Sequence, residues 1–215
     1  MRLAPEGWPF VRVALALDAA LLVIWYAFPG WSLAFLAVGV LLTIWVAAFF
    51  RDPERPGPRG DRLVLAPADG RVCGIAQVEE PVYLHEKATR VSIFMSVLNV
   101  HVNRYPVSGE IEVVHYNPGQ FTVASHDKAS LVNEQASVGI NGPRGPVLVR
   151  QIAGNIARRI VTDAAAGEKA VQGERLGMIR FGSRVDLFLD AKVPLKVQLN
   201  QRVVAGQTVI AEYAG

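Results

Sequence analysis

The sequence has few of the residues from which cross-links and metal sites are built. Only one of its 215 residues is a cysteine, which excludes an internal disulfide and any metal site made of several cysteines. Its four histidines show neither a His-x-x-x-His nor a His-Glu-x-x-His spacing, and no glycine-rich nucleotide-binding loop is present. We therefore predict no metal site, and we expect Cys73 to be a small core residue beside Val72.

The sequence also has little excess of charge of either sign. The formal net charge is only +3, and the basic residues form no long run, so nucleic acid is not expected as a partner. A mildly basic chain fits an anionic lipid surface, although plain solubility explains the charge as well. The composition is 51% hydrophobic, which favours a membrane segment followed by one globular domain.

Two apolar stretches open the chain. Residues 31–50 carry no charge and are long enough to cross a bilayer, whereas residues 13–28 are interrupted by Asp18, which is costly in a membrane unless it is shielded. The pair Pro29-Gly30 between them indicates a tight turn. We predict a helical hairpin, spanning or re-entrant. A cleaved signal peptide fits poorly, because the stretches occur in tandem and no small-residue cleavage site follows them.

Arginines on both sides of the hairpin predict its orientation. The side chains concerned are Arg2, Arg12, Arg51, Arg55, Arg59 and Arg62. The positive-inside bias places both ends in the cytoplasm, so we expect the cell (inner) membrane with the globular domain on the cytoplasmic face. The predicted domains are a membrane anchor at 1–51, a linker rich in proline, glycine and charge at 52–62, and a β-rich domain at 63–215.

Beyond residue 62 the sequence reads as short strands separated by glycine and proline, without a long amphipathic helical pattern. The expected strands are 63–66, 70–75, 90–97, 99–105, 110–116, 147–152, 157–161, 178–181, 185–189 and 203–213, with a hairpin turn at 139–145. Segments 66–72 and 196–212 resemble the barrel-sandwich hybrid of biotinyl and lipoyl carrier domains. The predicted fold is mainly β: a barrel-sandwich-hybrid-like domain preceded by a transmembrane helical hairpin.

The pair Gly182-Ser183 lies between two strand-like stretches near the C-terminus. A serine in this setting can attack the peptide bond that precedes it, and glycine helps because it adds no bulk and tolerates distorted backbone angles. The product would be two chains, with a new reactive group at the head of the shorter one. Most Gly-Ser pairs are ordinary turns, so this interpretation depends on the rest of the sequence.

Attack by a serine requires a base, a group that orients the base, and stabilisation of the oxyanion. Asn99, His101 and Asn103 alternate to one face of a predicted strand, and a polar strand face in so apolar a protein indicates a site. A half-buried histidine with satisfied hydrogen bonds explains the same pattern, and Asp69 fits a turn-capping role as well. The remaining histidines are expected in exposed or solvated positions: His85, His115 and His126.

Several ordered segments together resemble the phosphatidylserine decarboxylases, most closely the short form of that family. They are residues 50–55, 66–70, 99–104, 117–119, 150–154, 157–160, 173–177 and 181–183. The resemblance implies a proenzyme that cuts itself between Gly182 and Ser183 into a β chain of residues 1–182 and an α chain of residues 183–215. It implies that Ser183 becomes an N-terminal pyruvoyl group, and that Asp69, His101 and Ser183 form the triad for self-cleavage.

The resemblance also implies the reaction and its partners. Phosphatidylserine is converted to phosphatidylethanolamine and CO2, and a Schiff base with the pyruvoyl ketone withdraws the electrons that CO2 leaves behind. His101 is the candidate acid that protonates Cα. Longer members carry two histidines three residues apart, where this sequence has His101 and Arg104, so the division of work between His101 and other groups is open. The acyl chains stay in the bilayer, and a homo-oligomer is compatible with the sequence.

Two other functions share part of this pattern. A non-enzymatic, membrane-anchored barrel-sandwich adaptor would have the anchor and the β domain, but it gives no reason for a cut at Ser183, and such adaptors usually add long helical hairpins. A membrane serine hydrolase would use Ser183 while the chain stays whole. The size of the polypeptide on a denaturing gel distinguishes these alternatives from a self-cleaving proenzyme.

Overall fold

The computed structural model describes residues 2–119, 133–154, 159–180 and 183–214. The chain forms two compact units, Met1–Glu54 and Arg55–Gly215. The boundary between them falls inside the stretch predicted as a linker. The second part of that stretch is attached to the β-rich unit, because Arg59 Nη1 donates to Gly206 O at 2.8 Å and Gln207 Nε2 donates to Pro56 O at 2.9 Å.

The first unit contains two apolar helices. After a two-residue strand and a single 3-10 turn come the two helices, and a second short strand then pairs antiparallel with the first. These elements are β1 (Arg2–Leu3), η1 (Pro5–Gly7), α1 (Trp8–Ala27), α2 (Ser32–Phe49) and β2 (Arg51–Asp52). Both helices are long and apolar enough to cross a membrane, so the prediction of two apolar N-terminal helices is confirmed.

The carboxyl group of Asp18 is shielded between the two helices. Thr43 Oγ1 on α2 donates a hydrogen bond to Asp18 Oδ2 on α1 at 2.7 Å. A Cβ atom on Gly39 would lie 2.6 Å from Asp18 Oδ1, so the missing side chain at Gly39 makes room for the carboxyl group. Polar residues inside apolar helices pair in this way across helix interfaces.

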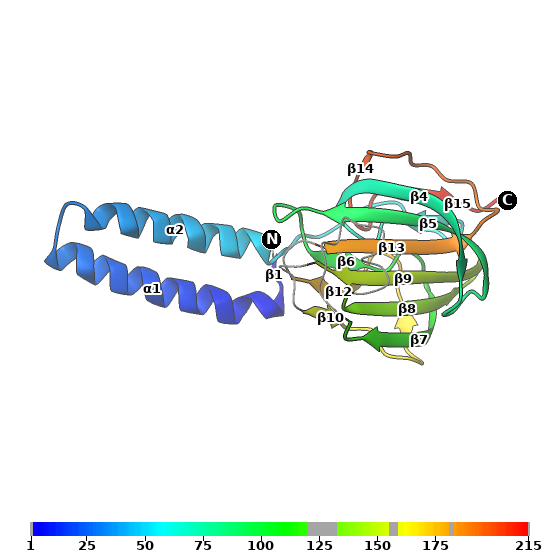
Figure 1. Ribbon diagram of the computed structural model, residues 1–215, viewed down its shortest axis with the longest axis horizontal. Helices are drawn as coiled ribbons and strands as arrows, with labels where there is room; N and C mark the ends of the chain where they lie inside the picture. Colours follow the sequence, from blue (N-terminus) through cyan, green and yellow to red (C-terminus); the bar gives the residue numbers. More distant parts are fainter. Residues whose placement is uncertain (1, 120–132, 155–158, 181–182, 215) are drawn as a thin grey trace. The chain divides into compact units, whose positions relative to one another are not determined.

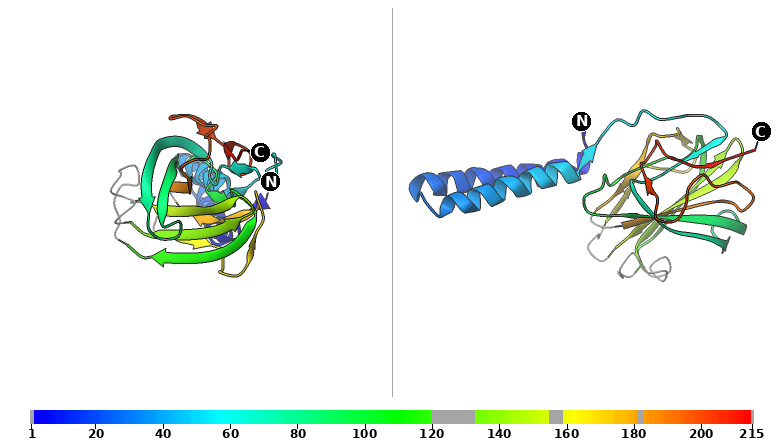
Figure 2. Two further views of the ribbon diagram at one scale, coloured as in Figure 1. Left: turned by 90° about the vertical axis from the view of Figure 1, so that its right-hand side faces the viewer. Right: turned by 90° about the horizontal axis from the view of Figure 1, so that it is seen from above.

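The second unit is built around an eight-stranded antiparallel sheet, which curls strongly (Figures 1 and 2). The strand order is β11-β7-β8-β9-β13-β5-β4-β14. The bounds are β4 (Gly70–Glu80), β5 (Glu86–Met95), β7 (Gly109–Asn117), β8 (Gln135–Gly142), β9 (Gly145–Ala153), β11 (Lys169–Ala170), β13 (Ser183–Asp190) and β14 (Arg202–Val203).

Two smaller sheets complete this unit. One has the order β10-β12-β6, and the other pairs β15 with β3. Their strands are β3 (Leu63–Leu65), β6 (Val102–Arg104), β10 (Ile160–Thr162), β12 (Arg175–Ile179) and β15 (Val209–Glu212). The mainly β prediction for this part of the chain is confirmed.

The hydrophobic core lies between the three sheets. Strands β5 and β13 of the large sheet place alternate side chains in it, among them Ile93 and Leu187, while Ile179 comes from β12 and Ile210 from β15. All four are fully buried. Burial of an aliphatic side chain of this size stabilises the fold by roughly 1.5–3 kcal/mol, so the packing of one sheet on the others holds the site residues in place.

Some sequence-based expectations differ from the structure. Cys73 is exposed, not a core residue; since successive strand residues point to opposite faces, the burial of Val72 turns Cys73 away from the core. The hairpin turn is confined to Gly142–Gly145, while Gly139 lies within β8. The single strand expected at 203–213 is two strands, because the chain turns at Gly206, where φ is +69°.

A buried carboxylate fixes the loop between β4 and β5. Glu80 is 1% exposed. Its side chain accepts backbone N–H groups from Val82, Tyr83 and Leu84, and Arg150 Nη2 on β9 donates to Glu80 Oε1 at 2.8 Å. Burial disfavours the charged form, but the N–H groups and the guanidinium outweigh it, so the pKa of Glu80 lies below its ordinary value.

We predict that Glu80→Gln lowers the free energy of unfolding by about 2–3 kcal/mol at neutral pH, the scale of charge-assisted hydrogen bonds. A carboxyl whose folded pKa is lowered stabilises the fold above its unfolded pKa, and the stabilisation is lost as the pH falls through the folded value. The difference in the free energy of unfolding between wild type and Glu80→Gln should therefore become smaller below about pH 4.3. Thermal denaturation of the detergent-solubilised chain measures it, with Glu79→Gln, an exposed neighbour, as control. A gap that widened in acid would contradict this account.

Candidate active site

Ser183 is the first residue of a central strand. It pairs with Met95 on β5 and with Ala153 on β9, and it is fully buried. Figure 1 shows β13 lying between these two strands. The bond predicted to be cleaved joins Gly182 to Ser183. Gly182 lies outside the residues that the structure describes.

The predicted cut falls where the chain passes from one sheet to another. Strand β12 ends at Ile179 in the three-stranded sheet, and β13 begins at Ser183 in the eight-stranded sheet. On the first side, Ile179 N donates a hydrogen bond to His101 O at 3.3 Å. Three residues therefore connect two anchored strand ends, one of which is bonded to the backbone of His101.

His101 lies just before β6 and is fully buried, more so than the half-buried position that we considered from the sequence. Its Nδ1 atom is 3.0 Å from Asn99 O. A carbonyl oxygen only accepts hydrogen bonds, so Nδ1 carries the proton and, in the neutral ring, the lone pair resides on Nε2. This is the tautomer in which a histidine takes a proton from a nucleophile through Nε2.

The expected polar strand face is shorter than predicted. Asn99 lies outside the strand, in the turn after β5, where its Oδ1 accepts hydrogen bonds from Ser96 N and Ser96 Oγ, each at 2.8 Å. An asparagine side chain that closes a turn in this way competes with strand pairing. Asn103 does lie in β6 and is fully buried. Of the two asparagines, only Asn103 therefore has a buried side chain in the strand. Asn99 contacts His101 through its backbone carbonyl.

Asp69 is held by two partners. Arg55 Nη2 lies 2.6 Å from Asp69 Oδ2, and each of these side chains is 13% exposed. The other carboxylate oxygen, Oδ1, accepts Ala205 N at 2.8 Å. Gly70 follows directly, and a Cβ atom there would lie 2.1 Å from Phe94 O, so only glycine allows β4 to begin this close to β5.

The segment that leads to Asp69 is bonded to the segment that follows His101. The segment before β4 runs antiparallel to the segment containing β6, with two hydrogen bonds: Leu65 N to Pro106 O and Arg104 N to Pro67 O, each at 2.9 Å. The chain bends at residues 67–69, so the last of these hydrogen bonds lies two residues before Asp69. The two segments are thus joined at Pro67 and Arg104, whereas the carboxylate oxygens of Asp69 bind Arg55 and Ala205 N.

A chain of buried polar side chains leads to Ser183. Ser183 Oγ donates to Met95 Sδ at 3.3 Å, and Asn103 Nδ2 is 3.6 Å from the same sulfur atom. Gln151 Nε2 on β9 donates to Asn103 Oδ1 at 2.8 Å. Neither Met95 nor Gln151 was predicted as a site residue, although Gln151 falls in segment 150–154, which carried part of the family resemblance.

Comparisons with known proteins identify the family of this chain. The family model of phosphatidylserine decarboxylase matches residues 42–211. The chain belongs to the phosphatidylserine decarboxylase family. A relative from Symbiobacterium thermophilum is 48% identical over 209 residues, covering 97% of this chain and 94% of the relative. One from Azorhizobium caulinodans is 48% identical over 211 residues (97% and 88%), and one from Aromatoleum aromaticum 46% over 211 residues (98% and 95%). All three are named phosphatidylserine decarboxylase proenzyme.

Membership of the phosphatidylserine decarboxylase family confirms the resemblance drawn from the sequence and favours an enzyme over an adaptor. Arg104, at the position where the sequence raised the question of a second histidine, has a structural contact. The residue is 9% exposed and donates from Nη1 to Gly173 O at 3.0 Å. Arg104 thus holds the turn at Gly173, where φ is +82°. Of the other histidines, His85 and His115 are exposed and His126 lies outside the described residues.

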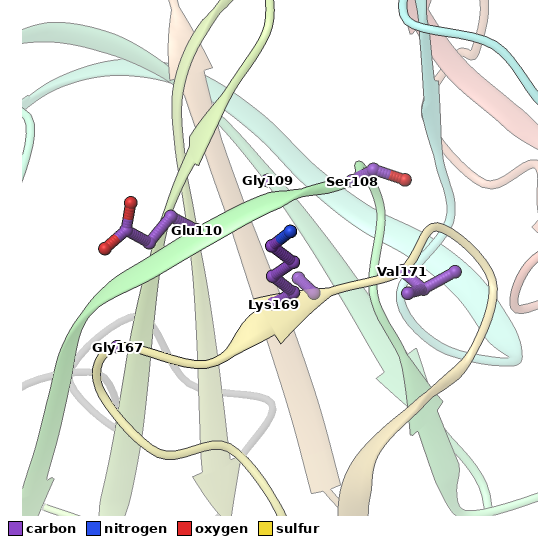
Figure 3. A pocket seen from close by; sticks show the side chains of 7 residues that line it. Ser108, Gly109, Glu110, Gly167, Lys169 and Val171 are labelled. Carbon is purple, nitrogen blue, oxygen red and sulfur yellow. The ribbon is translucent and has the colours of Figure 1, made fainter.

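One surface cavity of the β-rich unit lies apart from these residues. It has a volume of about 520 Å³ and is lined by Ser108, Gly109, Glu110, Gly167, Lys169, Ala170 and Val171, at the edge where β11 meets β7 (Figure 3). None of the predicted site residues lines it. Among the described residues, no group of three or more histidine, cysteine, aspartate or glutamate side chains could hold a metal ion.

We predict that Arg55→Met lowers the free energy of unfolding by about 3 kcal/mol, because it leaves a largely buried carboxylate without its charged partner. Arg55→Lys should recover part of the loss, since lysine keeps the charge but not the planar fork. Arg59→Met is the matched control: it removes hydrogen bonds to the carbonyls of Gly206 and Arg55 and should cost only about 1 kcal/mol. Equal losses in Arg55→Met and Arg59→Met, measured by denaturation, would rule out a special role for the Asp69 pair.

Proposed function

We propose that this chain is a membrane-bound proenzyme that cuts itself between Gly182 and Ser183 and then converts phosphatidylserine to phosphatidylethanolamine and CO2. The observation that carries the proposal is the position of Ser183. Its hydroxyl is fully buried at the start of a central strand, four residues after an anchored strand end that is bonded to His101. The names of the relatives support both self-processing and the substrate.

In the proposed cleavage, Ser183 Oγ forms a bond to the carbonyl carbon of the preceding residue. The hydroxyl proton passes to His101 Nε2, the C–N bond breaks, and the proton is returned to the departing nitrogen. The amide has then become an ester. The Cα proton of residue 183 is then removed, a C=C bond forms between Cα and Cβ, and the new carboxylate of chain 1–182 leaves. Cβ takes up a proton to become a methyl group while a C=N bond forms, and water replaces the nitrogen as ammonia, so a ketone remains at the head of chain 183–215.

The surroundings of residue 183 fit a pyruvoyl group. Its cross-strand neighbours are Met95 and Ala153, which suit a methyl group in place of the CH2–OH of serine, and the group is no larger than the serine from which it forms. Those two residues and the backbone of β13 would hold it. When formed, the ketone supplies the electron sink for the carbanion that loss of CO2 leaves on the substrate.

We assign the proton transfers to His101. Its Nδ1–H is bonded to Asn99 O, so the ring is fixed and Nε2 is the atom that takes or gives a proton, first from Ser183 and later to Cα of the product. Asp69 is the proposed third member of the triad. Its carboxylate oxygens bind Arg55 and Ala205 N, and Nδ1 of His101 is bonded to Asn99 O, so the proposed contribution of Asp69 is electrostatic and does not include orienting the ring.

The two apolar helices suit an enzyme whose substrate is a lipid, because the acyl chains can stay in the bilayer while the headgroup reaches the site. We propose the cell (inner) membrane, with the β-rich domain on the cytoplasmic face. The support is the distribution of arginines around the helices, with Arg2 and Arg12 before or within the first helix and Arg51 after the second.

The central experiment compares the wild-type chain with Ser183→Ala on a denaturing gel with intact-mass measurement. We expect wild type to give chains 1–182 and 183–215, the shorter one without an N-terminal amine, and Ser183→Ala to give one full-length chain without activity. Without denaturant the two wild-type chains should stay together, because β13 remains bonded to β5 and β9. A full-length wild-type polypeptide that still released CO2 would refute the proposal.

Orientation is tested by protease treatment of sealed membrane vesicles. Inside-out vesicles should lose the β-rich domain, residues 63–215, whereas right-side-out vesicles should protect it until detergent is added. The reason is the positive-inside bias of the flanking arginines. Digestion of the domain in intact right-side-out vesicles would place it on the outer face instead.

A further inference from the structure

Four fully buried side chains form a polar chain that joins two sheets at the site. Ser183, Met95 and Gln151 belong to the eight-stranded sheet, while Asn103 reaches it from β6 of the three-stranded sheet. The contacts run from Ser183 Oγ to Met95 Sδ, from Asn103 Nδ2 to the same sulfur, and from Gln151 Nε2 to Asn103 Oδ1. The proposed cleavage by Ser183 and His101 uses none of the amide groups.

The orientation of the Asn103 amide follows from its two neighbours. Oδ1 accepts the N–H of Gln151, so Nδ2 faces the sulfur of Met95. The reverse orientation would set two acceptors, Oδ1 and Sδ, against each other and lose the donation to sulfur. Gln151 therefore determines that Asn103 presents a donor, not an acceptor, on the side where Ser183 lies.

This donor has only a weak partner. A thioether sulfur is a poor hydrogen-bond acceptor, and a buried N–H that meets no strong acceptor forgoes much of its bonding free energy. Because the hydroxyl of Ser183 contacts the same sulfur atom, the N–H group and the nucleophile are separated by that single atom. An oxygen that gains negative charge beside Ser183 Oγ is a much stronger acceptor, and in a buried site the bond to it is strengthened further.

Gln151 adds an unsatisfied atom to the same cluster. Its Oε1 is buried without a hydrogen-bond partner among the described residues. Native proteins leave few buried polar atoms in this state, and those that remain often mark a functional site. Two buried amides therefore retain bonding capacity in the cluster of contacts that ends at Ser183.

We propose that Asn103 donates the hydrogen bond that stabilises the negative charge formed when Ser183 attacks, and that Gln151 is the positioning residue that keeps the Asn103 amide in its donating orientation. The inference rests on the proposed self-cleavage. As Ser183 Oγ bonds to the carbonyl carbon, the electron pair of the C=O bond moves to its oxygen. The N–H of Asn103 turns from Met95 Sδ to that oxygen and keeps its proton.

The decisive variant is Asn103→Asp. It keeps the size of the side chain and an acceptor for Gln151 Nε2, but it places a carboxylate oxygen where the N–H was. Removal of one donor of this kind slows acyl transfer by about 100-fold or more. We therefore expect the half-time of cleavage, followed on denaturing gels after a pulse of cell-free synthesis in lipid vesicles, to lengthen by about 100-fold. Asn103→Leu, which buries no charge, should slow cleavage similarly.

Gln151→Leu tests positioning. It should slow cleavage by about 10-fold, since the amide of Asn103 is then free to turn, and it should add nothing to Asn103→Leu, because residues that act as one unit are not additive. A merely structural role would give additive losses. An independent, additive effect of Gln151→Leu would overturn its assignment as the positioning residue.

Gln172→Leu is the matched control for burial of an amide. Gln172 is 6% exposed, and its Nε2 donates to Leu63 O and Pro106 O. The substitution should lower the thermal midpoint but leave the half-time of cleavage unchanged. Thermal midpoints of all variants are compared in the Ser183→Ala background, where every chain is uncut. Two results would overturn the inference. One is cleavage of both Asn103 variants at the wild-type rate. The other is that Gln172→Leu slows cleavage as much as the Asn103 variants do while its thermal midpoint equals theirs. Failure of wild type itself to cut would refute the proposed function instead.

Discussion

The pairing of β13 on both of its edges is the constraint on which the site depends. From Ser183 onward this strand is bonded to β5 along its whole length and to β9 along most of it. An edge strand whose N-terminal connection was cut would be bonded on one side only, whereas a central strand keeps hydrogen bonds on both sides and its buried face. Residue 183 can therefore keep the same position before and after the proposed cleavage, first as the nucleophile and then as the ketone. The surrounding residues need not rearrange between self-cleavage and decarboxylation.

Burial gives the proposed cleavage its direction. Ser183, His101, Asn103 and Gln151 are all fully buried. If water reached the ester formed by Ser183, hydrolysis would return an ordinary serine at the new terminus and no ketone would arise. A dry site favours loss of the Cα proton instead, and water is needed only after the longer chain has been expelled. The same exclusion of water strengthens each hydrogen bond in the polar chain, so the burial that stabilises the fold also selects the product.

Local patterns were predictable from the sequence, and contacts set by long-range register were not. The apolar helices and most strands follow from hydrophobic periodicity, and the family motifs pointed to Ser183, His101 and Asp69, whose roles are still proposals. Met95 is in the cluster only because β5 pairs with β13, 88 residues further along the chain, and no pattern near Met95 encodes that pairing. Arg55 and Gln151 lay in segments of the family resemblance, but neither was predicted to contact a site residue. Asn99 was misplaced because its side chain closes a turn instead of continuing the strand.

The group that orients His101 suits a reaction that happens once per molecule. In a serine hydrolase a carboxylate holds Nδ1 and stabilises the protonated ring through every turnover. Here Asn99 O accepts that hydrogen bond, and Asp69 is compensated by Arg55. A carbonyl oxygen can orient the imidazole ring just as a carboxylate can, but it stabilises the protonated ring less. His101 is therefore a weaker base in the proposed cleavage. In the proposed mechanism this cost is small, because cleavage happens once. The protonated ring would then give its proton to the product carbanion more readily, in the proposed reaction that does turn over.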